Sequence, residues 1–310
     1  MSARLQDLSS YEYVLPGSAA CAGCPSSIAL RLVGKALGEN AVMVMTPSCA
    51  VASTGPLPHS CYNVPALNVC FASAGAAAGG LSLALEAQYE KGRLQGEMPT
   101  VFTWVGDGGT YDIGLQGLSA AAERNDNFIH FCYNNEAYSN TGMQRSGATP
   151  MHAVTTTTPL GKENPRKNLA MIMLRQEIPY MATASLSYPM DLYRKVVKAK
   201  SIKGFKYIEI HAPCAPGWKF ATADTVEIGR LAVRSGAWLL WEAENGQVAV
   251  SSPTSQFTEG KAQPIPMIDY IGKQGRFAHL LKRDDQDAVL EEMRAAVLRD
   301  IRRLAENVNG

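Results

Sequence analysis

Short apolar segments alternate with segments of helical periodicity through most of the chain. Runs of mostly apolar residues bounded by glycine, proline or polar residues are typical of buried strands. These runs cover residues 41–45, 101–105, 128–133 and 207–211, with a shorter one at 182–184. Elsewhere apolar residues recur every three or four positions, which predicts helices. These helices cover residues 26–38, 72–91, 114–124, 168–176, 189–200 and 225–236. The alternation predicts an α/β fold with a mostly parallel sheet flanked by helices.

Three segments break this alternation. Residues 1–25 predict an irregular arm, and residues 46–68 predict a loop rich in proline, serine and cysteine. Residues 137–168 predict a long loop, and loops of this length are usually functional or disordered. Three basic residues of that loop are expected at the solvated surface, with an anion or partner contact as the alternative. They are Arg145, Lys162 and Arg166.

The last part of the chain has a different pattern. Residues 238–241 and 248–250 predict a hairpin around the turn Glu244-Asn245-Gly246. A Pro-rich extended stretch is expected at 253–268, followed by helices near 268–280 and 285–306. We therefore divide the chain into an α/β domain, 1–245, and a C-terminal extension, 246–310.

The composition narrows the class of protein. The chain has 310 residues, 46% of them hydrophobic and 18% charged, and its net charge is +1. This length can bury a large core, whereas near-neutral charge gives no electrostatic case for binding nucleic acid or a membrane. No apolar run is long enough for a transmembrane helix, and the first residues lack the apolar core of a signal peptide. We expect a cytoplasmic protein. The small residues at 72–80 predict extensive subunit contacts, with close internal packing as the alternative.

One pair of motifs carries chemistry. Gly106-Asp107-Gly108 follows the strand at 101–105, and Asn134-Asn135 follows the strand at 128–133. Each motif alone is an ordinary turn or loop. Together they place an Asp and an Asn at the ends of two strands, where both can bind one Mg²⁺ through oxygen. Glycines beside them let the backbone approach a diphosphate closely. The spacing predicts a Mg²⁺–diphosphate site.

The cysteines suggest a second centre. Their odd number and the expected cytoplasmic location argue against a disulfide framework. Cys21 and Cys24 form a CxxC pair, and Cys49 and Cys214 each lie in a loop after a strand. If both strands end beside the Gly106 turn, four thiolates converge there, which suits a [4Fe–4S] cluster or structural zinc. Buried free thiols are the alternative, and they are the expected state of Cys61, Cys70 and Cys132.

These motifs together resemble one protein family. The segments are PGSAACAGCPSSIALRLV, GDGGTYDIGLQGLSAAAER, NNEAYSNTGMQRSGATP, TTTTPLGK and HAPCAPGW. They are similar to the thiamine-diphosphate-binding β subunit of the pyruvate/2-oxoacid:ferredoxin oxidoreductases, over residues 10–245. The resemblance implies a thiamine-diphosphate-binding fold with an N-terminal cysteine arm and a C-terminal extension that packs on partner subunits. It also implies thiamine diphosphate, Mg²⁺ and a proximal [4Fe–4S] cluster as cofactors.

The resemblance assigns roles to individual residues. The implied cluster ligands are Cys21, Cys24, Cys49 and Cys214, and Cys49 also lies beside the thiamine cofactor. The implied Mg²⁺ ligands are the side chains of Asp107 and Asn135 and the backbone carbonyl of Ala137. The residues implied to cradle the diphosphate are Gly106, Gly108 and Gly109. Asn140 is implied to face the reacting end of the cofactor as a catalytic residue.

One catalytic group is missing from the motifs. Thiamine enzymes use a glutamate at the pyrimidine ring, and no glutamate of this chain is placed for that role. The resemblance implies that a partner subunit of the α, γ or δ type supplies it, together with further clusters, and that ferredoxin accepts the electrons. Two alternatives remain: a non-redox thiamine enzyme with structural zinc, and a non-catalytic assembly subunit.

The substrate is less defined than the family. Ser18, Pro25 and the segment Pro47–Val51 depart from the usual pyruvate-type pattern near the expected pocket. The resemblance implies a small 2-oxoacid such as pyruvate, with coenzyme A accepting the acyl group. Oxalate is the alternative substrate, because its second carbon is itself oxidised to CO₂ without coenzyme A.

Overall fold

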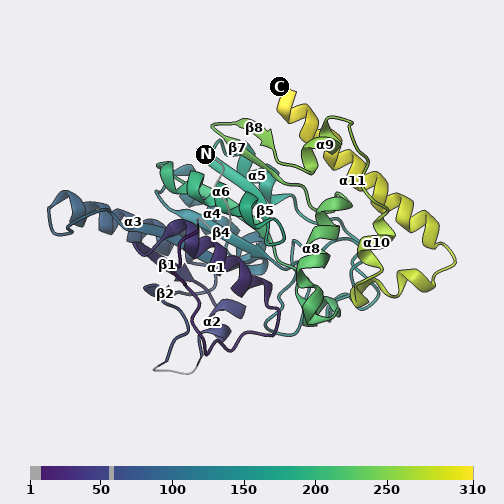
Figure 1. The fold of residues 1–310 in the computed structure, drawn as a ribbon, viewed down its shortest axis with the longest axis horizontal. Coiled ribbons are helices and arrows are strands. Elements are labelled where there is room, and N and C mark those ends of the chain that lie inside the picture. The colour runs from purple at the N-terminus through teal and green to yellow at the C-terminus, as the bar shows by residue number, and fades with distance from the viewer. Residues whose placement is uncertain (1–7, 56–58, 310) are drawn as a thin grey trace.

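The fold is built on one eight-stranded sheet. The computed structural model describes residues 8–55 and 59–309. The strand order is β2-β1-β3-β4-β6-β5-β7-β8 (Figure 1). The strands are β1 (Ala41–Met45), β2 (Ala66–Asn68), β3 (Thr100–Gly106), β4 (Ile129–Asn134), β5 (Tyr180–Ser185), β6 (Lys206–His211), β7 (Trp241–Glu244) and β8 (Gln247–Val250). The first six strands run parallel, and β7 and β8 are antiparallel, which confirms the predicted mostly parallel sheet.

Helices cover both faces of this sheet. The helices α1 (Pro25–Leu37) and α6 (Pro189–Ser201) pack side by side on one face. The opposite face carries α3 (Ala74–Glu90), α4 (Leu115–Glu123) and α5 (Leu169–Arg175). The distal end of α3 and the loop after it extend away from the rest of the molecule (Figure 1).

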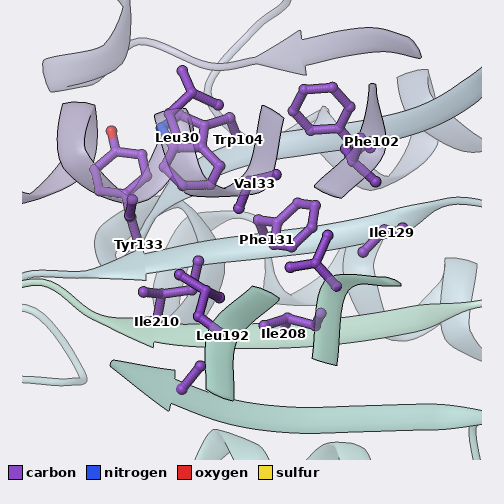
Figure 2. Packing of buried hydrophobic residues seen from close by; sticks show 14 of the residues in the cluster. Leu30, Val33, Phe102, Trp104, Ile129, Phe131, Tyr133, Leu192, Ile208 and Ile210 are labelled. Carbon is purple, nitrogen blue, oxygen red and sulfur yellow. The ribbon is translucent and has the colours of Figure 1, made fainter. Parts of the chain in front are cut away.

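The hydrophobic core beneath α1 positions β3 and β4. Figure 2 shows Phe102 and Trp104 of β3 and Phe131 of β4 in one cluster with Leu30 and Val33 of α1. All five side chains are at most 1% exposed, and burial of each contributes about 1.5–3 kcal/mol. This packing holds β3 and β4 rigidly side by side, and the two sequence motifs follow directly from these strands.

The C-terminal part builds a further layer. The helices α8 (Thr225–Arg234) and α10 (Met267–Ile271) pack with the long helix α11 (Gln286–Asn309) around a third hydrophobic cluster. The hairpin turn at Asn245-Gly246 has positive φ at both residues, as a tight hairpin requires. Because β7 and β8 lie on either side of this turn, the boundary expected at residue 245 falls within the main sheet.

Several expected elements of the C-terminal part were wrong. The first hairpin strand is β7, not 238–241, and Trp238 and Leu240 before it pack into the third hydrophobic cluster. The expected extended stretch contains the helix α9 (Thr254–Thr258), because its prolines flank this helix instead of interrupting it. The helix expected at 268–280 ends at Ile271 and continues as two short 3₁₀ turns, Gly275–Phe277 and Leu280–Lys282.

Two loops also contain structure that the pattern did not predict. The loop 46–68 holds the short helix α2 (Cys49–Ser53) and the edge strand β2, whose residues are all exposed. Another short helix, α7 (Ala215–Trp218), follows Cys214. Residues 1–7 of the expected N-terminal arm lie outside the described part of the chain. Among the described residues, no helix has the length and apolar character needed to cross a bilayer.

Candidate functional site

The two motifs meet at the carboxyl edge of the sheet. In the parallel pairing of β3 and β4, Gly106 lies opposite Tyr133. The next residues on β3 and β4 are therefore neighbours, and the Asn135 backbone N–H donates to Asp107 Oδ1 over 3.1 Å. The structure thus brings the predicted Asp and Asn together. Ligand sites in parallel α/β sheets are usual at this edge.

Asp107 is a buried carboxylate. It is 0% exposed, and its Oδ2 accepts a hydrogen bond from Ser146 Oγ at 2.5 Å. Burial raises the pKa of Asp107 to about 8, although the bonds from Ser146 and from the backbone oppose this shift. No cationic side chain forms an ion pair with it among the described residues. A bound cation would supply the missing positive charge.

The carboxamide of Asn135 tests whether Mg²⁺ fits. With its nitrogen turned inward, the amide donates to Asp107 Oδ1 at 3.0 Å and to the Ala137 carbonyl at 2.8 Å. With its oxygen inward, it accepts from Ser139 Oγ at 2.8 Å and faces those two acceptors directly. Octahedral Mg²⁺ with bonds of 2.0–2.1 Å separates adjacent oxygens by about 2.9 Å. The distances from the inward amide atom to the other two oxygens, 2.8 and 3.0 Å, therefore fit Mg²⁺ with the amide oxygen inward.

Two of the three glycines of the turn, Gly108 and Gly109, leave no room for a side chain. A Cβ on Gly108 would lie 2.4 Å from the Tyr138 ring, and one on Gly109 would lie 2.6 Å from Val105 Cγ1. A Cβ on Gly106 would meet only ordinary contacts at 3.5 Å. These glycines border a cavity of about 190 Å³. Of the predicted site residues, those lining it are Cys49, Gly106, Gly108, Gly109, Asn135, Ala137 and Asn140.

The CxxC arm is fixed beside the Cys214 loop. Gly23 has a φ of +67°, and a Cβ there would lie 2.3 Å from the Thr222 carbonyl oxygen. Thr225 Oγ1 donates to the Gly23 carbonyl at 3.0 Å. These contacts hold Cys21 and Cys24 against the segment that follows Cys214.

The four predicted cysteines lie within electrostatic reach of one another. Burial raises the pKa of Cys49 to about 12, and the other three thiolates reinforce the shift. Burial also raises the pKa of Cys214, and the charges of Cys24 and Cys21 add to that effect. Among the described residues, no three His, Cys, Asp or Glu side chains surround one point closely enough to hold a single metal ion. Cys61 and Cys132 are buried as expected, whereas Cys70 is exposed.

Some residues of the site were missed by sequence reasoning. The Trp218 indole N–H donates to the Asn135 carbonyl at 2.9 Å. Glu136, between two predicted Mg²⁺ ligands, has a φ of +61° and pairs with the buried Arg276 at 2.7 Å. The positively charged guanidinium of Arg276 lies 3.5 Å from the centre of the Trp218 ring. Trp218 ends the segment HAPCAPGW, which does not predict this contact, and Arg276 lies outside every motif; both reach the site through the tertiary fold.

Of the three basic residues of the 137–168 loop, Arg145 is exposed as expected, whereas Lys162 is buried. Lys162 is only 6% exposed, and its Nζ donates to the Thr149 carbonyl at 2.6 Å. Burial lowers the pKa of Lys162 to about 8. Arg166 donates to the Ala237 carbonyl and lies 3.4 Å from Glu136. Solvated surface is therefore wrong for Lys162, whereas other parts of the loop, such as Leu160, are exposed.

The chain is similar in sequence to known proteins. Residues 48–210 match the family described as "Thiamine pyrophosphate enzyme, C-terminal TPP binding domain". Pyruvate synthase subunit PorB of Methanothermobacter marburgensis is 44% identical over 296 residues, covering 94% of this chain and 98% of that protein. This chain belongs to the β subunits of the 2-oxoacid:ferredoxin oxidoreductases. These enzymes bind thiamine diphosphate and work with partner subunits.

Further relatives show the breadth of this β-subunit family. Ketoisovalerate oxidoreductase subunit VorB of Pyrococcus abyssi is 41% identical, and the match covers 91% of each chain. A solved 2-oxoglutarate:ferredoxin oxidoreductase from Magnetococcus marinus aligns with a TM-score of 0.59 at 18% identity. That alignment covers 91% of this chain and 96% of the other, and it shows the shared fold. The fold and the family expected from the motifs are confirmed.

Proposed function

We propose that this β subunit holds thiamine diphosphate through Mg²⁺ and passes electrons from the substrate to a [4Fe–4S] cluster. Asp107, Asn135 and the Ala137 carbonyl would bind Mg²⁺, and the cluster would be bound by Cys21, Cys24, Cys49 and Cys214. The reaction is the oxidative decarboxylation of a small 2-oxoacid. Thiamine diphosphate supplies the stabilisation of a carbanion at the carbonyl carbon.

The position of Cys49 carries the redox part of this proposal. Its side chain lines the same cavity as Asn135 and Ala137. A cluster held by Cys49 would therefore adjoin the cofactor, where electrons are released. The separation of the four thiols also favours a cluster over zinc. Tetrahedral zinc needs its four sulfurs about 3.8 Å apart, whereas a four-iron cluster is larger and binds sulfurs that are farther apart.

Ser139 connects the two centres. Its hydroxyl donates to Asn135 Oδ1 at 2.8 Å and also interacts with Cys214, where it lowers the thiol pKa against the effect of burial. Asn140, the next residue, is exposed at the rim of the cavity. It has the position needed to donate to a substrate oxygen, the role proposed for it.

The electrons released by the proposed reaction require an acceptor. A 2-oxoacid and coenzyme A yield an acyl thioester, CO₂, one proton and two electrons, whereas oxalate yields two CO₂ and two electrons. The electrons leave singly through the cluster, and ferredoxin is the proposed acceptor. None of the described residues lining the cavity is a glutamate, and Glu136 is buried against Arg276. We therefore assign the acid–base glutamate to a partner subunit.

Cysteine variants of the anaerobically assembled complex test the cluster. Cys24→Ser should reduce iron content, visible absorbance and the paramagnetic signal after reduction. Cys70→Ser is the matched control because Cys70 is exposed and outside the proposed ligand set. A zinc-containing, iron-free complex would refute the cluster. Full activity of Asp107→Ala would show that the chain is an assembly subunit.

A substrate panel tests the reaction itself. Pyruvate, 2-ketoisovalerate and oxalate are supplied with and without coenzyme A, and reduction of ferredoxin is followed optically. We expect coenzyme A-dependent turnover of pyruvate, in keeping with the relatives named pyruvate synthase. Turnover of oxalate without coenzyme A would instead assign the alternative substrate.

A further inference from the structure

One buried hydroxyl at the carboxyl edge of the sheet has no partner. Thr46 directly follows β1 and is 0% exposed. Its Oγ1 makes no hydrogen bond within the described part of the chain. Buried hydroxyls are nearly always paired, so an unpaired one needs an explanation.

Thr46 lies against the glycine turn. Met45 of β1 pairs with Trp104 of β3, so the next residue lies beside the end of β3, where the turn begins. A Cβ on Gly109 would lie 3.4 Å from Thr46 Oγ1. The three residues after Thr46 line the proposed cofactor cavity, and Thr46 itself is buried directly behind this lining.

The other hydroxyls around the turn are already used. Ser48 Oγ donates to the Thr46 carbonyl at 2.8 Å, and Thr110 Oγ1 donates to the Gly106 carbonyl at 3.0 Å. Among the described residues that line the cavity there is no lysine or arginine. The groups that this chain offers a diphosphate there are therefore a bound Mg²⁺, backbone N–H groups and neutral donors. Thr46 offers a neutral donor that is buried and not engaged by any described residue.

We propose that Thr46 Oγ1 donates a hydrogen bond to an oxygen of the diphosphate. This inference rests on the proposed placement of thiamine diphosphate in the cavity. It also explains why an unpaired hydroxyl persists in the core: its partner belongs to the cofactor.

Two substitutions at Thr46 separate binding from folding. Thr46→Val keeps the shape and removes the hydroxyl, and Thr46→Ser keeps the hydroxyl. The matched control is Thr183→Val, because the Thr183 hydroxyl is also buried but donates to the Leu239 carbonyl at 2.7 Å, far from the glycine turn. Unfolding is measured on the cofactor-free full chain. Binding of thiamine diphosphate and of inorganic pyrophosphate, both with Mg²⁺, is measured calorimetrically on the assembled complex.

The expected pattern has opposite signs for folding and binding. Thr46→Val should leave the unfolding midpoint unchanged or raise it, because it removes an unpaired polar group. It should lower the affinity for both ligands by roughly tenfold to a hundredfold, because one hydrogen bond to a charged group is lost. Thr46→Ser should restore most of this affinity. Thr183→Val should lower the midpoint without changing the affinity.

Two results would overturn the assignment. Unchanged affinity in Thr46→Val shows that the hydroxyl does not contact the cofactor, and a lowered midpoint then shows that it pairs within the protein. If the affinity for thiamine diphosphate falls while the affinity for pyrophosphate is unchanged, Thr46 contacts another part of the cofactor. Failure of the proposed function is a separate result, since the wild-type complex would then bind neither ligand.

Discussion

Replacing Arg276 with methionine is expected to destabilise the protein strongly, although Arg276 lies outside every recognised motif. Its Nη2 lies 2.7 Å from Glu136 Oε2, and the two side chains are 1% and 4% exposed. Burial acts to raise the pKa of Glu136, but Arg276, His211 and Arg166 outweigh burial and hold the pKa below its ordinary value. Arg276→Met would leave this carboxylate buried without its main partner.

The expected magnitude follows from this burial. Breaking a buried ion pair by removing one partner costs about 3–5 kcal/mol. Arg166 remains 3.4 Å from Glu136 and would compensate in part, so we expect about 3 kcal/mol. The double variant Glu136→Gln with Arg276→Met removes both charges and should cost less than the single variant. The coupling energy between the two sites should therefore exceed about 1 kcal/mol.

Urea unfolding of the two single variants and the double variant measures this coupling. Arg294→Met is the matched control, because its pair with Glu291 is largely exposed and contributes little. A second measurement is Mg²⁺-dependent binding of thiamine diphosphate. Arg276 stacks on Trp218, which in turn holds the Asn135 carbonyl, so the binding should also weaken.

Additive effects of the two substitutions on the free energy of unfolding would refute the reasoning. If the double variant lost as much stability as the sum of the single variants, the pair would carry no coupling. If Arg276→Met matched wild type in stability, Glu136 would be solvated or paired by other groups. Unchanged cofactor affinity in an unstable variant would confine the role of Arg276 to folding.

Other predictions concern the site and its support. Gly108→Ala should cost about 1–3 kcal/mol because its Cβ would collide with Tyr138, whereas Gly106→Ala should change the unfolding free energy by less than about 1 kcal/mol; urea denaturation that ranked them equally would contradict this. Burial lowers the pKa of His130 to about 3, so the folded chain binds fewer protons than the unfolded chain below pH 6.5. Stability should fall on acidification, and His130→Gln should reduce the loss between pH 7 and pH 5 by about 2 kcal/mol. Asn140→Ala should lower kcat by on the order of tenfold or more with nearly unchanged Mg²⁺ affinity, and a purely raised Kd would argue for a binding role.

The sequence predicted the parts of the site that depend on local order. Asp107 and Asn135 each follow a strand, and adjacent parallel strands necessarily bring such residues to one edge. The strands themselves were recognisable because they are buried on both faces and read as continuous apolar runs. The position of Cys49 beside the cavity followed from the same rule, since β1 pairs with β3.

Contacts between distant segments could not be predicted in this way. Arg276 reaches Glu136 only because the 3₁₀ turn that carries it packs against α7. Thr46 and Ser146 are ordinary polar residues in sequence, and only the fold shows that one is unpaired and the other bonds Asp107. The prolines also led to a wrong prediction of an extended stretch at 253–268, because Pro253 precedes α9 and marks its start.

The contact between Arg276 and Glu136 has a consequence for biosynthesis. Ribosomes add about 5–20 residues per second, so Cys21 emerges roughly ten seconds to a minute before Arg276. During that interval the thiols of the N-terminal arm exist without the segments that later surround them. The proposed cluster site can therefore be completed only after most of the chain has been synthesised.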